Sequence, residues 1–345
     1  MDRFQNWEAL PTQADPVTPA VAAQVSDLSL FALTVGPPFS RTCPRNAREQ
    51  VSRRTVARFR NRICVFLAAV GKWPGSPSPV TAIGGQNQRL RRNDVASIRV
   101  NKAKQKLQNG EIITVVSGLQ SSDIIDFLGP MGFDAAWIEC EHGSIDWHEL
   151  GNMTRACDLW EMASVTRVNS NDPGLITRTL DRGSLGIVVP HVNTKEAAEQ
   201  AAQSTKYSPL GYRGMFGGRQ SFGVGDYFHR ANDQTMVIVL LEEAEALENL
   251  DEILTVPDID VFFIAPSDLS QTMGHIGDAG HPEVLKAIDD GIAKIIAAGK
   301  VAGTLVNDAN VEEYAQKGVQ FLMTPWNAWV ARGAAAFVEK ANNVR

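Results

Sequence analysis

The chain has 345 residues and a formal net charge of −6, with 44% of its residues hydrophobic and 21% charged. This balance is ordinary for a soluble globular protein, and the length suffices for one large domain or two modest ones. No run of about 18 apolar residues occurs, so we expect no membrane span. The four cysteines show no paired spacing. We therefore expect neither a disulfide framework nor a zinc knuckle, and a reducing, cytoplasmic location.

The charge divides the chain into two kinds of sequence. Residues 1–93 hold 12 Arg, one Lys and five acids, a net charge of +8, whereas the remainder carries −14. Sustained apolar periodicity begins only at about Ile98. We therefore predict a disordered, Arg/Pro/Ser-rich extension over 1–97 and one folded domain over 98–345. A targeting leader, a stretch upstream of the true start, and a basic arm for nucleic acid are the alternatives for the extension. No nucleic-acid role is expected for the domain.

Eight short apolar runs, rich in β-branched residues, are typical of strands buried on both faces. They span 112–116, 135–138, 163–167, 186–190, 236–241, 261–264, 301–306 and 320–323. Amphipathic segments with capping residues separate them. These segments span 122–129, 147–159, 173–183, 194–205, 245–254, 281–299 and 310–318. Eight such alternations predict an α/β fold of the (β/α)8 TIM-barrel type; a doubly wound open sheet is the alternative.

Active sites of this barrel lie at the carboxyl ends of the strands. Acids, one arginine and histidines follow the predicted strands there, which indicates a site on one rim. Glu242 and Asp268, after neighbouring strands, offer carboxylates for a hard divalent cation, Mg²⁺ or Mn²⁺. Such a metal would act as a Lewis acid on a 2-oxo acid.

Three further side chains complete the predicted chemistry. Arg167 could stabilise the developing oxyanion, and His142 is a near-neutral base with Glu139 placed to orient it. Together these groups favour making or breaking a C–C bond beside a carbonyl. Each also has a non-catalytic interpretation. His142 could be a loop histidine, Arg167 could form a structural ion pair, and Glu242 and Asp268 could be acids at helix N-termini. No role is assigned to His191, His275 or His281.

In the order and spacing of several motifs the sequence resembles one family, the HpcH/HpaI aldolases. These are metal-dependent class II pyruvate aldolases. The resemblance covers about residues 98–345. It is carried by GFDAAWIECEHG (132–143), VTRVN (165–169), GIVVPHVNTKEAAE (186–199), GYRG (211–214), LEEAEALENLDEIL (241–254), IDVFFIAPSDLS (259–270) and GHPEVL (280–285).

The resemblance implies a TIM barrel with metal ligands at Glu242 and Asp268, an enolate-stabilising Arg167, and a catalytic His142. Glu139 falls where other members usually carry Asp as the partner of that histidine. The resemblance also implies a metal of the Mg²⁺, Mn²⁺ or Co²⁺ kind. It further implies a substrate of pyruvate or a close 2-oxo acid with an aldehyde, and a homo-oligomer, hexamer or trimer.

The resemblance also implies that the main chain at Ser267 and Asp268 receives the substrate carboxylate. Leu240 stands where some members carry a substrate-contacting Gln. Trp326 stands where smaller residues are expected, so we expect it either to narrow the substrate pocket or to form an aromatic wall of it. The predicted function is cleavage or formation of 4-hydroxy-2-oxo acids. The alternatives are a CoA-thioester lyase of the citrate-lyase β or malyl-CoA type, with GYRGMFGGR (211–219) as its phosphate groove, and a non-catalytic acid-binding barrel.

Overall fold

The computed structural model describes residues 97–344, and the predicted extension over 1–97 lies almost wholly outside them. Eight parallel strands pair in chain order, and β1 also pairs with β8, which closes the barrel. The strands are β1 Ile113–Leu119, β2 Ala135–Glu139, β3 Ala163–Arg167, β4 Gly186–Val189, β5 Met236–Leu241, β6 Val261–Ile264, β7 Ala302–Leu305 and β8 Phe321–Pro325. The predicted (β/α)8 barrel is confirmed.

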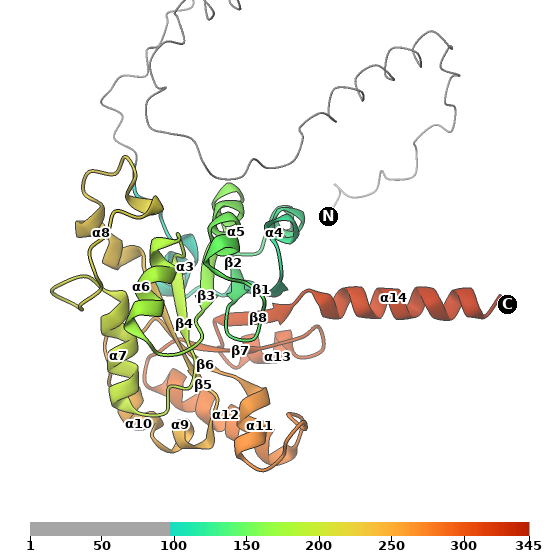
Figure 1. Cartoon of the computed structure of the whole chain (residues 1–345). Helices are drawn as coiled ribbons and strands as arrows, with labels where there is room; N and C mark the ends of the chain where they lie inside the picture. Colours follow the sequence, from blue (N-terminus) through green and yellow to red (C-terminus); the bar gives the residue numbers. More distant parts are fainter. Residues whose placement is uncertain (1–96, 345) are drawn as a thin grey trace, which may run out of the picture. The chain divides into compact units, whose positions relative to one another are not determined.

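Helices surround the strands (Figure 1). Those before β5 are α3 Lys102–Gln108, α4 Ser122–Leu128, the 3₁₀ turn η2 Gly129–Met131, α5 Trp147–Leu159, α6 Pro173–Asp181, α7 Lys195–Thr205, the 3₁₀ turn η3 Arg219–Ser221 and α8 Tyr227–Gln234. Those after β5 are α9 Ala244–Glu248, α10 Leu250–Ile253, α11 Pro266–Thr272, α12 Pro282–Ala297, α13 Val311–Gln316 and α14 Asn327–Asn342.

Local chemistry explains where several of these helices begin. Side chains of Asp146, Asp172 and Thr194 accept main-chain N–H groups in the first turns of α5, α6 and α7. Such caps satisfy donors that a helix start leaves without partners. The segment predicted as one helix over 245–254 is two short helices, because the chain turns at Asn249.

Alternate residues of each strand fill the barrel interior. The Trp137 ring centroid lies 5.3 Å from that of Phe263, and Phe263 lies 5.9 Å from Phe321. Small residues make room for these rings: a Cβ at Gly303 would lie 2.8 Å from Phe263 Cδ2. The interior of the barrel is therefore filled by a layer of aromatic side chains, called here the aromatic floor. The next inward-facing residues lie on its side toward the carboxyl ends of the strands.

Helix α14 differs from the other helices of the barrel. It extends away from the strands (Figure 1), and none of its residues is buried. Val330, Phe337 and Val338 on it are more than half exposed. Among residues 97–344, no helix is long and apolar enough to cross a membrane.

Candidate active site

The alternation of strand side chains determines what lies above the aromatic floor. Because Trp137 and Leu240 face inward, Glu139 and Glu242, two positions further along their strands, face inward as well. The same parity places Arg167 above Val165. These three side chains line a cavity of about 410 Å³ at the carboxyl end of the barrel.

The cavity brings together most of the side chains predicted from the sequence. The predicted residues that line it are Glu139, His142, Arg167, Glu242, Ser267 and Asp268. Apolar side chains of Leu240, Leu305 and Met323 complete its walls. The predicted rim therefore corresponds to a single concave site with a few polar groups on an apolar surface.

Strand register holds Arg167 in place. Residues 139 and 167 are partners across β2 and β3, and Arg167 Nε donates to Glu139 Oε2 at 2.6 Å. The second contact is an ion pair between Arg167 Nη1 and Glu141 Oε2 at 2.9 Å. The Arg167 side chain is 14% exposed. Two carboxylates thus fix the orientation of one guanidinium in the cavity wall.

Glu139 is engaged differently from the expectation. Its Oε1 accepts the main-chain N–H groups of Glu141 and His142 at 2.8 and 3.1 Å, while its Oε2 accepts from Arg167 and from Trp137 Nε1. The His142 ring is 68% exposed and its Nε2 lies nearest Glu141 Oε2, at 3.8 Å. The expected pairing of Glu139 with this ring is therefore corrected, because both Glu139 oxygens are already used.

Gly143 explains the tightness of the loop that carries these residues. A Cβ at position 143 would lie 2.6 Å from the main-chain oxygen of Glu139. Only glycine permits this close approach without a shift of the backbone. The turn folds the loop back over the end of β2, and the Glu139 carboxylate can therefore bind the loop N–H groups.

Glu242 is the most deeply buried acid of the site. It is 1% exposed, and its Oε1 accepts the main-chain N–H of His191 at 2.8 Å. Its Oε2 is buried and has no hydrogen-bond partner. Burial raises the pKa of Glu242, against the opposing effects of His191 and Arg167. A buried carboxylate oxygen without a partner is costly unless a ligand satisfies it.

His191, for which no role is predicted from the sequence, contacts the site through its main-chain N–H, which binds Glu242. It follows β4 with φ of 54°, a left-handed conformation that is uncommon for residues other than glycine. Its Nδ1 lies 2.8 Å from Glu243 Oε1, and its Nε2 lies 3.5 Å from Glu141 Oε1. Partial burial opposes the charged ring, but Glu243, Glu242 and Glu141 raise the pKa of His191. The strained backbone brings its N–H to Glu242.

Trp326 lies behind the cavity wall. Its Nε1 donates to the carbonyl of Gly118 at 2.9 Å, and a Cβ at Gly118 would lie 3.4 Å from the indole. Gly118 lines the cavity, whereas the indole packs with an apolar cluster that includes Leu119, Ile125 and Leu128. Trp326 therefore does not line the cavity as expected; it supports the end of β1 from behind.

Residues 112–327 match the family described as HpcH/HpaI aldolase/citrate lyase. A 2-dehydro-3,6-dideoxy-6-sulfogluconate aldolase of Pseudomonas putida is 35% identical over 228 residues, covering 65% of this chain and 87% of the relative. A 4-hydroxy-2-oxo-heptane-1,7-dioate aldolase of Klebsiella pneumoniae is 37% identical over 229 residues, covering 65% and 86%. A solved HpcH/HpaI aldolase/citrate lyase family protein from Burkholderia cenocepacia superposes with a TM-score of 0.67 at 29% identity, covering 70% of this chain and all of that chain.

The barrel and its cavity therefore belong to a lyase of the aldolase class, which acts on small molecules. The chain belongs to the HpcH/HpaI aldolase/citrate lyase family, as the sequence motifs predicted.

Proposed function

We propose that the protein is a divalent-metal-dependent aldolase that cleaves a 4-hydroxy-2-oxo acid into pyruvate and an aldehyde, or joins them. The observation that carries the proposal is Glu242, a buried carboxylate with a partnerless oxygen in a cavity shared with Asp268 and Arg167. The named activities of the relatives in Pseudomonas putida and Klebsiella pneumoniae support an aldolase of this kind.

Glu242 and Asp268 are the residues that would hold the metal. Both offer carboxylate oxygens, and the partnerless Glu242 Oε2 fits a cation that restores its lost interactions. Oxygen donors select hard ions, so Mg²⁺ or Mn²⁺ is the proposed cofactor, with Co²⁺ as the third candidate. When bound, such an ion supplies Lewis-acid stabilisation of negative charge on a substrate oxygen.

Arg167 supplies the fixed positive charge. Glu139 and Glu141 hold its Nε and Nη1, so the guanidinium cannot turn away as the substrate enters. In cleavage, the C3–C4 bond breaks and its electrons move toward the C2 oxygen, which becomes an enolate oxygen. A preoriented guanidinium in a cavity wall stabilises this charge without rearranging during the reaction.

His142 is the proposed base, and its ring lies at the cavity edge. In the direction of cleavage it accepts the proton of the C4 hydroxyl, and the aldehyde C=O forms as the C3–C4 bond breaks. A proton then added at C3 turns the enolate into pyruvate. Proton transfer by a positioned histidine contributes about 10²–10⁴-fold to a rate.

Substrate orientation follows from the other walls. Ser267 and Asp268 lie in the first turn of α11, where main-chain N–H groups lack helical partners, and we assign the substrate carboxylate to them. Leu240, Leu305 and Met323 offer apolar surface for the remainder of the substrate.

The CoA-thioester alternative is less well supported. The arginines of its candidate groove form internal ion pairs: Arg213 with Asp181 at 2.8 Å, and Arg219 with Asp158. Their side chains are 2% and 14% exposed. Neither is therefore available to bind phosphates at the surface of the groove.

A homo-oligomer is also part of the proposal, and the exposed apolar residues of α14 support it. Burying such residues against another copy would remove apolar surface from water. A cytoplasmic location remains an expectation from the cysteine pattern alone.

A coupled assay tests the function. Purified protein is stripped of metal with a chelator, supplied with 4-hydroxy-2-oxo acids, and assayed for released pyruvate with lactate dehydrogenase and NADH. We expect no release without metal, restoration by Mg²⁺ or Mn²⁺, and loss in Arg167→Ala. An unchanged rate in the metal-free protein would overturn the proposal.

A further inference from the structure

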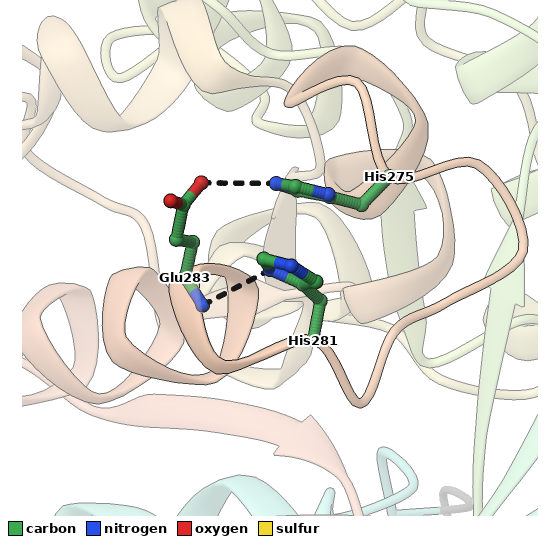
Figure 2. A group of neighbouring side chains, drawn as sticks. All are labelled: His275, His281 and Glu283. Carbon is green, nitrogen blue, oxygen red and sulfur yellow. Dashed lines mark hydrogen bonds and ion pairs between the residues drawn. The ribbon is translucent and has the colours of Figure 1, made fainter.

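A second cluster of side chains with metal-binding chemistry lies where the loop after α11 enters α12. The cluster consists of His275, His281 and Glu283 (Figure 2). Hydrogen bonds hold the loop in shape, because the N–H of His275 donates to Ser270 O at 2.7 Å and that of His281 donates to Asp278 O at 3.1 Å. The three side chains therefore sit on a formed turn.

The two imidazoles lie face to face. Their centroids are 3.5 Å apart with an angle of 14° between the planes. His275 Nε2 lies 3.0 Å from Glu283 Oε2, and His281 Nδ1 accepts the main-chain N–H of Glu283 at 3.3 Å. His275 thus directs a nitrogen toward the Glu283 carboxylate, whereas His281 directs its Nδ1 toward the main-chain N–H of Glu283 (Figure 2). One ligand atom from each residue falls within 4.8 Å of the others.

We propose that His275, His281 and Glu283 form a second metal site that takes Zn²⁺ or a similar divalent transition-metal ion. Zinc binds histidine nitrogen and carboxylate oxygen at about 2.0–2.2 Å in tetrahedral geometry, so neighbouring ligand atoms lie roughly 3.3 Å apart. His275 Nε2 and Glu283 Oε2, now joined by a hydrogen bond of 3.0 Å, would need to move apart only slightly for an ion to replace the shared proton. Binding requires one ring to tilt out of the parallel stack so that the nitrogens converge.

The donor set separates this site from the one proposed for catalysis. Glu242 and Asp268 offer only oxygen, which suits Mg²⁺ and Mn²⁺, whereas two imidazoles favour Zn²⁺, Co²⁺ or Ni²⁺. The two ions would therefore occupy different places in one chain. Three protein ligands leave a fourth position of the tetrahedron for water.

The position of the cluster gives the site a structural consequence. His275 follows the end of α11, while His281 caps α12 and Glu283 lies in its first turn. A bound ion would join the end of α11 to the start of α12. Because α11 carries Asp268 in its first turn, the ion would restrain the helix that bears a proposed ligand of the catalytic metal.

Titration with Co²⁺, whose visible absorption reports coordination, tests the site. Full-length protein is stripped of metal, supplied with excess Mg²⁺ for the oxygen site, and titrated with Co²⁺. We expect one Co²⁺ with tetrahedral absorption bands in the wild type and in Glu242→Gln/Asp268→Asn. The affinity should fall by at least ~10-fold in Glu283→Gln and in His275→Phe, which keeps a ring to stack on His281.

Two further variants make the test specific. His281→Asn removes the imidazole but keeps a good helix cap, so it should lose Co²⁺ affinity without loss of the folded state. His229→Phe, an exposed histidine on α8, should bind as the wild type does. Unchanged Co²⁺ affinity in His275→Phe and His281→Asn would overturn the proposal, as would absorption of an octahedral, fully hydrated ion in the wild type.

Discussion

The two ends of the barrel each hold buried charged side chains, and the two groups differ in how completely they are satisfied. At the amino end, Lys104 Nζ lies 2.9 Å from Asp260 Oδ1 and donates to Thr235 O at 2.8 Å. Lys206 Nζ donates to the carbonyls of Asn232 and Thr235, both at 2.9 Å. Each charge there has partners supplied by the fold itself.

At the carboxyl end the fold leaves an interaction unmade. Glu242 has a buried oxygen without a partner, although its other oxygen is bound by the His191 N–H. The Lys104 and Lys206 ammonium groups are therefore bound by oxygens of the chain, whereas a buried carboxylate oxygen left open to a cavity is available to a ligand. Of these buried charged groups, the Glu242 carboxylate is therefore the one with an oxygen open to a ligand in the cavity.

Removing the open carboxylate should have the largest effect. Glu242→Gln keeps the shape of the side chain but lowers the affinity for a hard cation, so we expect the rate of pyruvate release to fall at least ~10³-fold. Glu245→Gln, an exposed acid on α9, is the matched control. The coupled assay measures the rate of pyruvate release in both variants. Equal rates in Glu242→Gln and Glu245→Gln would contradict a role for the buried cavity carboxylate in the reaction.

Changing the fixed cation should have the next largest effect. Arg167→Lys keeps the positive charge but loses the fork that binds Glu139 and Glu141, so we expect a fall of about 10²-fold in kcat. Arg230→Lys, an exposed arginine on α8, should be neutral. Steady-state kinetics measures the change, and a wild-type kcat in Arg167→Lys would show that any charge at this position suffices.

The amino end should affect stability and its dependence on pH. Burial lowers the pKa of Lys206 to about 8, against an ordinary value of 10.5. Between these values the unfolded state binds more protons, so the free energy of unfolding rises with pH; above 10.5 it stays level at the higher value. Relative to Lys206→Met, the free energy of unfolding of the wild type should rise by about 3 kcal/mol from pH 7 to 10.5. Urea unfolding at several pH values measures this free energy. The same dependence on pH in the wild type and in Lys206→Met would contradict the lowered pKa.

The smallest effect is expected behind the cavity wall. Trp326→Phe keeps an aromatic ring but removes the hydrogen bond to the Gly118 carbonyl, which should cost about 1 kcal/mol in the free energy of unfolding. The Mg²⁺-supported rate should change less than it does in Arg167→Lys. Denaturant unfolding and the coupled assay test this together. A loss of activity equal to that of Arg167→Lys would instead indicate that Trp326 contacts the substrate.

Strand positions were predictable because β-branched runs buried on both faces have a clear signature. The runs at 163–167, 236–241 and 261–264 coincide with β3, β5 and β6. Four helices were not predicted: α3, α8, α11 and α14. α11 is short and was interpreted only as a capping motif, and α14 buries no residue, so it lacks the one-sided pattern of a barrel helix.

Strand ends also indicated which side chains would meet, since parallel strands bring them to one rim. Contacts within the rim could not be predicted, because they depend on rotamers and on the turn at Gly143. Glu139 therefore binds loop N–H groups instead of the His142 ring. The positive φ of His191, which places its N–H on Glu242, has no sequence signal comparable to a glycine.

Exchange of the methyl hydrogens of pyruvate tests the central claim most directly, because it requires enolate formation but no aldehyde. Pyruvate is incubated in D₂O with the metal-stripped protein, with and without Mg²⁺, and its methyl signal is followed by NMR. We expect the methyl signal to disappear with Mg²⁺ in the wild type, and to persist in Glu242→Gln and in the wild type without metal. A persistent signal in the Mg²⁺-loaded wild type, or equal exchange in Glu242→Gln, would contradict it.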